Sequence, residues 1–201
     1  VCYCIDQGWY GLENLSLIPG RVGGAPIQNI GAYGVEVADS IEAVEYLSLD
    51  VNAELSPFKS HHTSEEDKNI VKAKRRHLDN VEPALVRLSP SECKFGYRDS
   101  IFKRQLADKT AITAVYFRLQ KQFKARLTYP ALKSYIETEA GLALASVSAK
   151  QVARAVISIR QQKLPNTKDL PNAGSFFKNV EMGAAEFELF IRCYPDAPFF
   201  K

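Results

Sequence analysis

A glycine-rich stretch near the start of the chain decides the fold: Pro26-Ile27-Gln28-Asn29-Ile30-Gly31-Ala32-Tyr33-Gly34. With the residues just before it, residues 19–34 hold five glycines and two prolines. This composition predicts a long structured loop rather than a regular helix or strand. Because glycine lets the backbone approach a ligand closely, such a loop is a candidate binding site. A structural glycine-rich turn without a ligand is the alternative.

Two further stretches combine charged or hydroxyl side chains with glycine and aromatic residues. They are Cys93-Lys94-Phe95-Gly96-Tyr97-Arg98-Asp99-Ser100-Ile101-Phe102-Lys103 and Asn172-Ala173-Gly174-Ser175-Phe176-Phe177-Lys178-Asn179. Phe176 and Phe177 can shield the Ser175 hydroxyl from bulk water, which would make it a fixed proton donor or acceptor. Composition alone equally allows a turn serine at this position and an exposed, salt-bridging arginine at Arg98.

Read in chain order, and with Gly11-Leu12-Glu13-Asn14-Leu15 before them, these stretches resemble the UDP-N-acetylenolpyruvoylglucosamine reductase family. The resemblance implies an α+β chain. Residues 1–147 would form an FAD-binding domain of the PCMH / vanillyl-alcohol-oxidase-like type, and residues 148–201 part of an α+β substrate-binding domain. We expect both to be incomplete, because the family's N-terminal loop for the FAD diphosphate and its C-terminal catalytic glutamate have no counterpart in this sequence.

Residues 50–82 depart from the family pattern as an insertion. They are polar and unpatterned, and a basic cluster, Lys72 to Arg76, lies near their end. Such a segment has little apolar area to bury, so we expect a surface excursion that proteases cut first at 68–76. A nucleic-acid interface at the basic cluster is a weak alternative, because no aromatic residues are interleaved there.

Local signals predict the regular elements on either side of this insertion. Residues 1–7 should be a helix that Gly8 stops. Residues 44–49, 84–88 and 111–119 have strand composition. The capping box Ser89-Pro90-Ser91-Glu92 predicts a short helix leading to Phe95–Arg98.

Two more helices are expected in the last third of the chain. A second capping box begins at Ser148, and the residues behind it place Val152, Ala155, Val156 and Ile159 on one helical face, with Arg160 at its edge. A last helix should cover about 183–193, ended by Pro195.

Composition sets limits on the partners of the chain. Hydrophobic residues make up 46% and charged residues 24% of 201 residues, with a formal net charge of +3. This charge gives no reason to expect nucleic acid or a membrane as partner. The four cysteines match no zinc or thioredoxin spacing, so we expect reduced thiols and no metal. We expect a cytoplasmic monomer.

The resemblance assigns the glycine-rich loop to the cofactor. It implies that FAD lies against Pro19, Gly20, Gly24, Ile27, Gly31 and Tyr33. Gly24 departs from the family pattern, which more often has alanine or serine there. Without the diphosphate loop, residues 1–201 alone are expected to bind FAD weakly.

The resemblance also implies the chemistry, which is NADPH-dependent reduction of the enolpyruvyl ether of a UDP-sugar. Arg98 would hold the substrate carboxylate and stabilise the developing enolate, because guanidinium binds carboxylates in a bidentate way. Ser175 would be the general acid that protonates the carbon next to the carboxylate.

Five further residues match positions that hold the substrate in the family. They are Tyr97, Tyr129, Arg160, Lys163 and Asn179. Lysine next to a diphosphate is favoured electrostatically, and a tyrosine can hydrogen-bond a phosphate. Val180 stands where the family usually has proline, so this loop should be less rigid. A non-catalytic flavin- or UDP-sugar-binding protein is the main rival interpretation.

Overall fold

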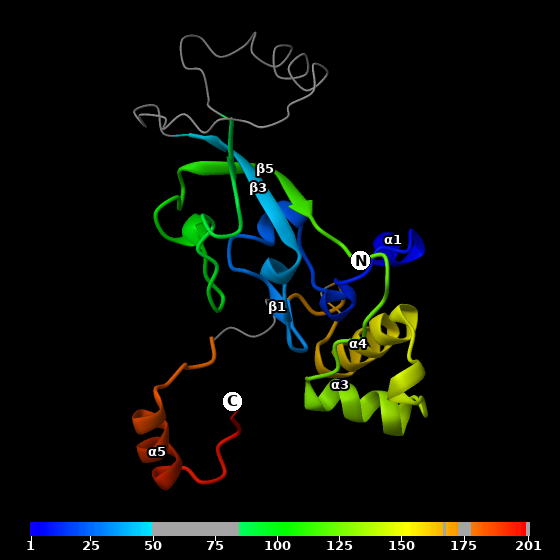
Figure 1. Cartoon of the computed structure of the whole chain (residues 1–201). Coiled ribbons are helices and arrows are strands. Elements are labelled where there is room, and N and C mark those ends of the chain that lie inside the picture. Colours follow the sequence, from blue (N-terminus) through cyan, green and yellow to red (C-terminus); the bar gives the residue numbers. More distant parts are fainter. Residues whose placement is uncertain (50–84, 167, 173–177, 200–201) are drawn as a thin grey trace, which may run out of the picture. The chain divides into compact units, whose positions relative to one another are not determined.

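The computed structural model describes residues 1–49, 85–166, 168–172 and 178–199 (Figure 1). The predicted insertion at 50–82 and Ser175 lie outside these ranges. The chain divides into two compact units, Val1–Pro165 and Asn166–Lys201, and each is described by itself. This division concerns compactness, so the predicted boundary between an FAD-binding and a substrate-binding domain at residue 147 stays a prediction.

The first unit mixes short helices and strands, as the predicted α+β class requires. Its α-helices and strands are α1 (Cys2–Asp6), β1 (Gly31–Ala32), β2 (Val35–Glu36), β3 (Ile41–Ser48), β4 (Leu85–Leu88), β5 (Thr110–Phe117), α3 (Pro130–Ser134) and α4 (Ala149–Lys163). Single turns of 3₁₀ or π helix connect them: η1 (Glu13–Leu15), η2 (Val22–Gly24), η3 (Val37–Asp39), η5 (Ile101–Lys103), η6 (Tyr135–Glu139) and η7 (Leu144–Ser146).

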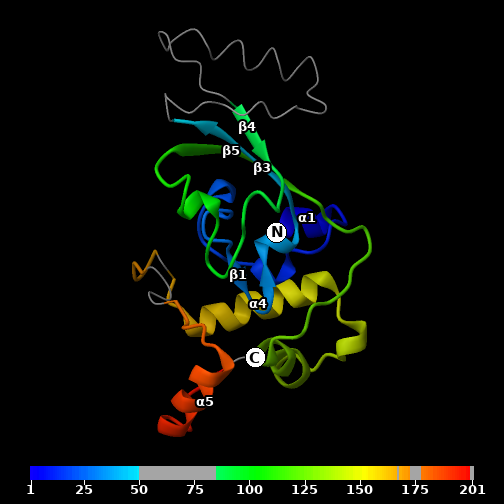
Figure 2. The same cartoon turned by 60° about the vertical axis from the view of Figure 1, so that its left-hand side comes forward.

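Three antiparallel strands form the larger sheet, in the order β4-β3-β5 (Figure 2). Val44 on the central strand pairs with Leu88 on one side and Val115 on the other, and it is fully buried. Tyr46 packs its ring edge-on against Phe102 at 5.7 Å between centroids. The three predicted strands are therefore confirmed for their described residues, and β3 begins three residues earlier than expected.

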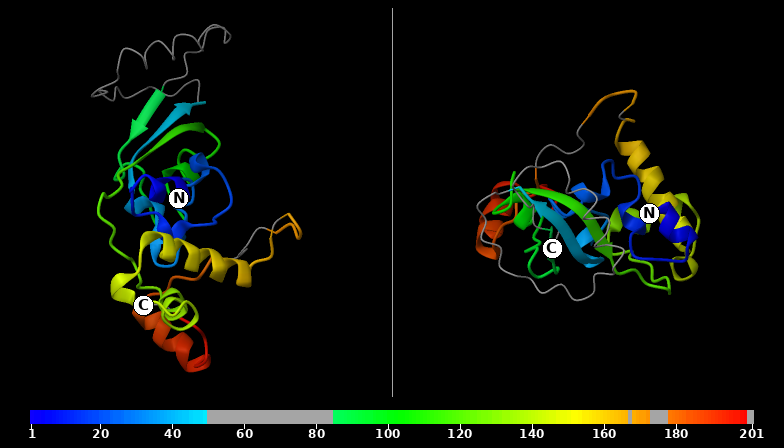
Figure 3. Two further views of the ribbon diagram at one scale, coloured as in Figure 1. Left: turned by 90° about the vertical axis from the view of Figure 1, so that its right-hand side faces the viewer. Right: turned by 90° about the horizontal axis from the view of Figure 1, so that it is seen from above.

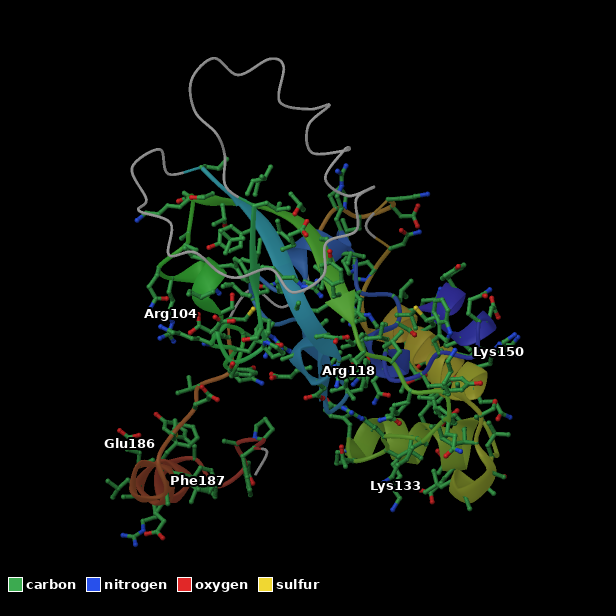
Figure 4. All side chains as sticks on the ribbon, turned by 45° about the horizontal axis from the view of Figure 1, so that its top comes forward. Arg104, Arg118, Lys133, Lys150, Glu186 and Phe187 are labelled. Carbon is green, nitrogen blue, oxygen red and sulfur yellow. The ribbon has the colours of Figure 1, made fainter. Side chains whose placement is uncertain are left out.

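Helix α4 is formed as its capping box predicts. The Ser148 hydroxyl accepts a hydrogen bond from the Gln151 N–H, and the Gln151 side chain accepts the Ser148 N–H at 2.8 Å. Every residue predicted for the buried face is buried. The helix packs against α1, α3 and η1 (Figure 3), and Lys150 at its start forms a 2.8 Å ion pair with Asp6 of α1 (Figure 4).

The prediction of a short helix after Ser89 is wrong. The expected local bonds exist, since the Glu92 carboxylate accepts the Ser89 N–H at 2.8 Å and the Ser89 hydroxyl at 2.5 Å. However, residues 90–94 make a single hydrogen-bonded turn. Lys94 adopts a φ of +47°, which a right-handed helix does not allow, so the chain leaves the turn there.

Residues 19–34 contain more regular structure than their composition predicts. Besides η2, they contain β1, which pairs antiparallel with β2, directly after residue 34, in a short hairpin. Its two turn residues, Tyr33 and Gly34, both have positive φ, +50° and +77°. Two positive values in a two-residue connection match the type I′ turn, whose twist suits a β-hairpin.

The second unit contains one α-helix, α5 (Ala184–Cys193), which confirms the last predicted helix. Glu186 accepts the Gly183 N–H at 3.2 Å, and the Phe187 and Phe199 rings lie 4.9 Å apart (Figure 4). Across the described parts of both units, no helix has the length and apolar character needed to cross a bilayer.

Candidate functional site

The β1–β2 hairpin is the centre of the candidate site, because predicted site residues from distant segments meet on it. The side-chain amide of Asn14 hydrogen-bonds the backbone of the hairpin turn. It donates to the Tyr33 carbonyl at 2.8 Å and to the Arg126 carbonyl at 2.9 Å. Asn14 is 2% exposed, so these bonds replace water that it has lost. One buried amide thus ties the hairpin turn to the segment leading to Tyr129.

The segment that contains Thr128 and Tyr129 approaches the hairpin turn so closely that only glycine fits at position 34. A Cβ at Gly34 would lie 2.7 Å from the Thr128 hydroxyl oxygen, and its φ of +77° also disfavours any side chain. Tyr129 therefore comes next to the turn. The Tyr33 and Tyr129 rings meet edge to face, with centroids 5.3 Å apart and planes at 79°.

Arg160, in the last turns of α4, lies close to the Tyr33 phenol. Burial raises the pKa of Tyr33 above its ordinary value, and the nearby positive charge of Arg160 partly opposes this effect. Within the described residues, the Arg160 Nε is buried and has no hydrogen-bond partner. A buried donor without an acceptor is costly, so an acceptor supplied by a ligand would stabilise this arginine. The structure thus groups Tyr33, predicted to contact flavin, with Tyr129 and Arg160, predicted to contact substrate.

Arg98 lies against the other end of the same hairpin. Gly96 and Asp99 exchange backbone hydrogen bonds of 3.0 and 3.2 Å around a tight turn, and Arg98 within it has a φ of +52°. Arg104 (Figure 4) forms an ion pair with Asp99 of this turn. The turn therefore places Arg98 in a backbone conformation that its side chain alone does not favour.

The Arg98 guanidinium binds backbone carbonyls of the glycine-rich loop. Its Nη2 donates to the Gly31 carbonyl at 2.5 Å, and its Nη1 donates to the Asn29 carbonyl at 3.4 Å. Tyr97 presents its ring to the same guanidinium at 5.1 Å from the centroid, an arrangement that attracts the cation. A residue predicted for catalysis is thereby attached to the loop predicted to hold the flavin.

The loop also offers an open apolar surface. Pro19, Gly20, Gly24 and Ile27 are exposed, whereas Gly31 and Tyr33 are half-buried. A Cβ built at Gly20 or Gly24 would meet nothing within 4 Å, so the backbone there is open to approach.

Three large apolar side chains of the same segment are exposed: Leu17 by 51%, Val22 by 61% and Ile27 by 41%. Open backbone beside exposed apolar side chains fits a flat heteroaromatic ring such as that of a flavin.

The described contacts do not test whether the remaining predicted residues belong to this group. Lys163 is exposed at the end of α4, three residues beyond Arg160. Asn179 is exposed in the second unit, which is described apart from the first. Ser175 lies outside the described residues. Their roles stay predictions.

Two residues that the sequence analysis did not single out organise the site. Asn29 is 1% exposed and connects three segments through its side chain, and Glu36 lies 3.8 Å from the Arg98 Nη1. The available signal was an asparagine in a glycine-rich loop, since asparagine tolerates a positive φ and bonds nearby backbone; Asn29 has a φ of +44°. For Glu36 no local signal exists, because its partner lies far away in sequence.

Comparison with known proteins supports a flavin site. A family model described as an FAD binding domain matches residues 1–50, which include the glycine-rich loop. Among the described residues, no cluster of three or more histidine, cysteine or acidic side chains is arranged to hold a metal ion.

Several curated relatives align with nearly the whole chain. The UDP-N-acetylenolpyruvoylglucosamine reductase of Chromobacterium violaceum is 39% identical over 198 residues, which cover 98% of this chain and 48% of that protein. The reductase of the same name from Bacteroides fragilis is 38% identical over 201 residues, covering 100% and 49%. That from Shewanella oneidensis is 41% identical over 194 residues, covering 96% and 46%.

The crystal structure of UDP-N-acetylenolpyruvylglucosamine reductase from Thermus caldophilus aligns with a TM-score of 0.46 at 22% identity, covering 96% of this chain and 48% of that one. The chain spans about half the length of the curated relatives that it matches. On the identity that it shares with those relatives along almost its whole length, the chain belongs to the UDP-N-acetylenolpyruvoylglucosamine reductase family.

Proposed function

We propose that the full-length protein containing this chain uses NADPH and FAD to reduce UDP-N-acetyl-3-O-(1-carboxyvinyl)glucosamine to UDP-N-acetylmuramate, a precursor of peptidoglycan. The observation that carries the proposal is the attachment of Arg98 to the carbonyls of Asn29 and Gly31. It puts a permanent positive charge at the edge of the loop that matches an FAD-binding family. A reaction that builds negative charge on a carboxylate next to a flavin needs a cation in such a place.

The cofactor is held by the glycine-rich loop in this proposal. When bound there and reduced by NADPH, FAD would supply the hydride for reduction of the enolpyruvyl double bond. The exposed face of the loop, with Pro19, Gly20, Gly24 and Ile27, takes the ring system, and Gly31 and Tyr33 border it. The exposed apolar side chains on this face exclude water from the ring once it is covered.

Arg98 then acts on the substrate carboxylate. A guanidinium has five N–H donors in a planar fork, and two of them are engaged by backbone carbonyls. No hydrogen bond from the other donors to a described residue is found, which leaves them for a substrate carboxylate in this proposal. Because the guanidinium stays charged at every relevant pH, it stabilises the negative charge that develops on the carboxylate side as the double bond is reduced.

The UDP group is assigned to Tyr129 and Arg160, with Lys163 and Asn179 as further contacts that the family resemblance predicts, and Tyr97 borders Arg98. The unpartnered Nε of Arg160 supports this assignment, because a phosphate oxygen is a suitable acceptor for a buried guanidinium donor. Ser175 is proposed as the donor of the proton to the carbon next to the carboxylate.

A direct experiment compares Arg98→Ala with Arg118→Ala in the full-length protein. Arg118 is a matched control, since it follows β5 (Figure 4), is exposed and forms an ion pair with Glu42 at 2.8 Å. NADPH oxidation that depends on the enolpyruvyl substrate, with UDP-N-acetylmuramate detected by mass spectrometry, would be present in the wild type and in Arg118→Ala. Arg98→Ala should lose about 10²–10³-fold in rate, the scale for removing one donor to a developing charge. A wild-type protein that consumes no NADPH with this substrate would refute the proposal.

A further inference from the structure

The Arg98 guanidinium has a charged neighbour besides the two carbonyls and the Tyr97 ring. The Oε1 of Glu36, at the end of β2, lies 3.8 Å from the Arg98 Nη1. This separation is too long for a hydrogen bond, so the carboxylate attracts the positive charge without occupying an N–H. Glu36 therefore lies beside the guanidinium without taking one of its N–H donors.

The Glu36 carboxylate is itself held in place. Its Oε2 accepts a 2.6 Å hydrogen bond from the Asn29 amide, which leaves Oε1 on the side of Arg98. The Asn29 amide cannot rotate freely, because its nitrogen also donates to the Gly96 carbonyl at 3.0 Å and its oxygen accepts the Ala38 N–H at 3.1 Å. A buried asparagine thus orients the carboxylate, and the carboxylate orients the guanidinium.

The arrangement links the two sides of the site. Asn29 binds the Gly96 carbonyl, at the start of the turn that carries Arg98, and its own carbonyl accepts from Arg98. Asn29 is therefore attached both to the turn that carries Arg98, through the Gly96 carbonyl, and to the Arg98 guanidinium itself. Such double attachment limits the guanidinium to a narrow range of positions.

We propose that Glu36, oriented by Asn29, is a positioning residue that aims the free donors of Arg98 at the carboxylate of the substrate. This inference rests on the role proposed for Arg98. It assigns no contact between Glu36 and substrate, and the effect of Glu36 passes through Arg98. The side chains of Arg98 and Glu36 are 30% and 38% exposed, so their attraction contributes little to folding stability. The role of this pair is therefore orientation.

The test is a double-mutant cycle in the full-length protein with Glu36→Gln, Arg98→Ala and the combination of both. Glutamine keeps the size of the side chain and an acceptor for Asn29 but removes the charge. Glu42→Gln is the matched control, because Glu42 also pairs with an arginine, Arg118, away from the hairpin. Two quantities are measured: the rate of substrate reduction, and the calorimetric Kd for the carboxyvinyl substrate relative to UDP-N-acetylglucosamine, which lacks the carboxylate.

Glu36→Gln should slow substrate reduction about 10- to 10²-fold, the scale of a misplacement of roughly 1 Å. It should weaken binding of the carboxyvinyl substrate but not of UDP-N-acetylglucosamine. In the Arg98→Ala background, Glu36→Gln should add no further loss. Glu42→Gln should behave as wild type. Glu36→Asp, which keeps the charge on a shorter side chain, should lie between wild type and Glu36→Gln, and it replaces Glu36→Gln in the cycle if that variant does not fold.

The outcomes separate this inference from the proposed function. If Arg98→Ala changes neither the rate nor the affinity for the carboxylate, the role of Arg98 is wrong and the inference fails with it. If Arg98→Ala is damaging but Glu36→Gln is silent, or lowers the rate equally in both backgrounds, Glu36 does not act through Arg98. The inference then fails alone and the proposed function stands.

Discussion

The guanidinium of Arg98 occupies the space that a side chain at Gly31 would fill. A Cβ built at Gly31 would lie 2.6 Å from the Arg98 Nη1, closer than such atoms approach one another. The same arginine donates to the Gly31 carbonyl at 2.5 Å. Because Gly31 has no side chain, the Arg98 guanidinium can lie against the β1 strand at this position.

Gly31→Ala should displace this guanidinium. Gly31 does not have a positive φ, so alanine is acceptable to the backbone and the effect comes from the clash with Arg98 and, at 3.1 Å each, with Glu36 and Val35. We expect substrate reduction by the full-length protein to fall about 10²-fold, with a stability loss of about 1–3 kcal/mol from overpacking.

Gly23→Ala, in the same loop, is the control for this substitution. A Cβ at Gly23 would make only ordinary contacts of 3.7 Å or more with Ile112. A crystal structure of Gly31→Ala with Arg98 unmoved would show that the glycine does not set its position.

Local sequence signals predicted those parts of the fold that local interactions stabilise. The helix after Ser148 is one, since the capping box and the buried face both lie within it. The turn after Ser89 has the same local bonds, but Lys94 leaves the helical conformation, and tertiary bonds such as that from the Ile101 N–H to the Cys93 carbonyl take over. A capping box therefore predicts the first turn of a helix, while its continuation depends on packing.

The site was predictable only in part, because its contacts join residues that are far apart in the sequence. Arg98 and Gly31 are 67 residues apart in sequence, and no periodicity links them. The residues that hold Arg98, namely Asn29 and Glu36, become visible only when the chain is folded. Family resemblance supplied the candidates, and the hydrogen bonds supply the reason why two of them, Arg98 and Gly31, are adjacent.

Asn29→Ala should destabilise the first unit. It removes three side-chain hydrogen bonds and leaves the Ala38 N–H and the Gly96 carbonyl without these partners, in a backbone conformation that alanine disfavours. We expect a loss of about 2–4 kcal/mol in the free energy of unfolding, measured by urea denaturation. The exposed Asn166, replaced by alanine, is the control and should change stability by less than about 0.5 kcal/mol. An unchanged midpoint for Asn29→Ala would contradict the central place given to this residue.

Cys93 should be inert to thiol reagents. Burial, with a smaller contribution from the Glu92 carboxylate, raises the pKa of the Cys93 thiol to about 12. Because the thiolate is the reactive form, Cys93 should remain unlabelled by DTNB at pH 8, while the exposed Cys2 and Cys193 react.

The raised pKa of Cys93 also determines whether stability rises or falls with pH. The pKa of Cys93 is raised in the folded state, so between about pH 8.5 and 12 the unfolded chain releases this proton and the folded chain keeps it. Stability should therefore fall as the pH rises through that window. Labelling of Cys93 in the native protein as fast as that of Cys2 would be inconsistent with its burial.

In the proposed function, the full-length protein reduces an enolpyruvyl carbon with Arg98 as electrostatic partner and Ser175 as proton donor. Stopped-flow absorbance separates flavin reduction by NADPH from the subsequent reduction of substrate. In Ser175→Ala we expect the first half-reaction to be almost unchanged and the second to fall by about 10²–10⁴-fold, the usual scale of general acid catalysis. Arg98→Lys should also slow only the second, because a point charge replaces a planar fork. If Ser175→Ala slowed only flavin reduction by NADPH and left substrate reduction intact, the role given to Ser175 would be wrong.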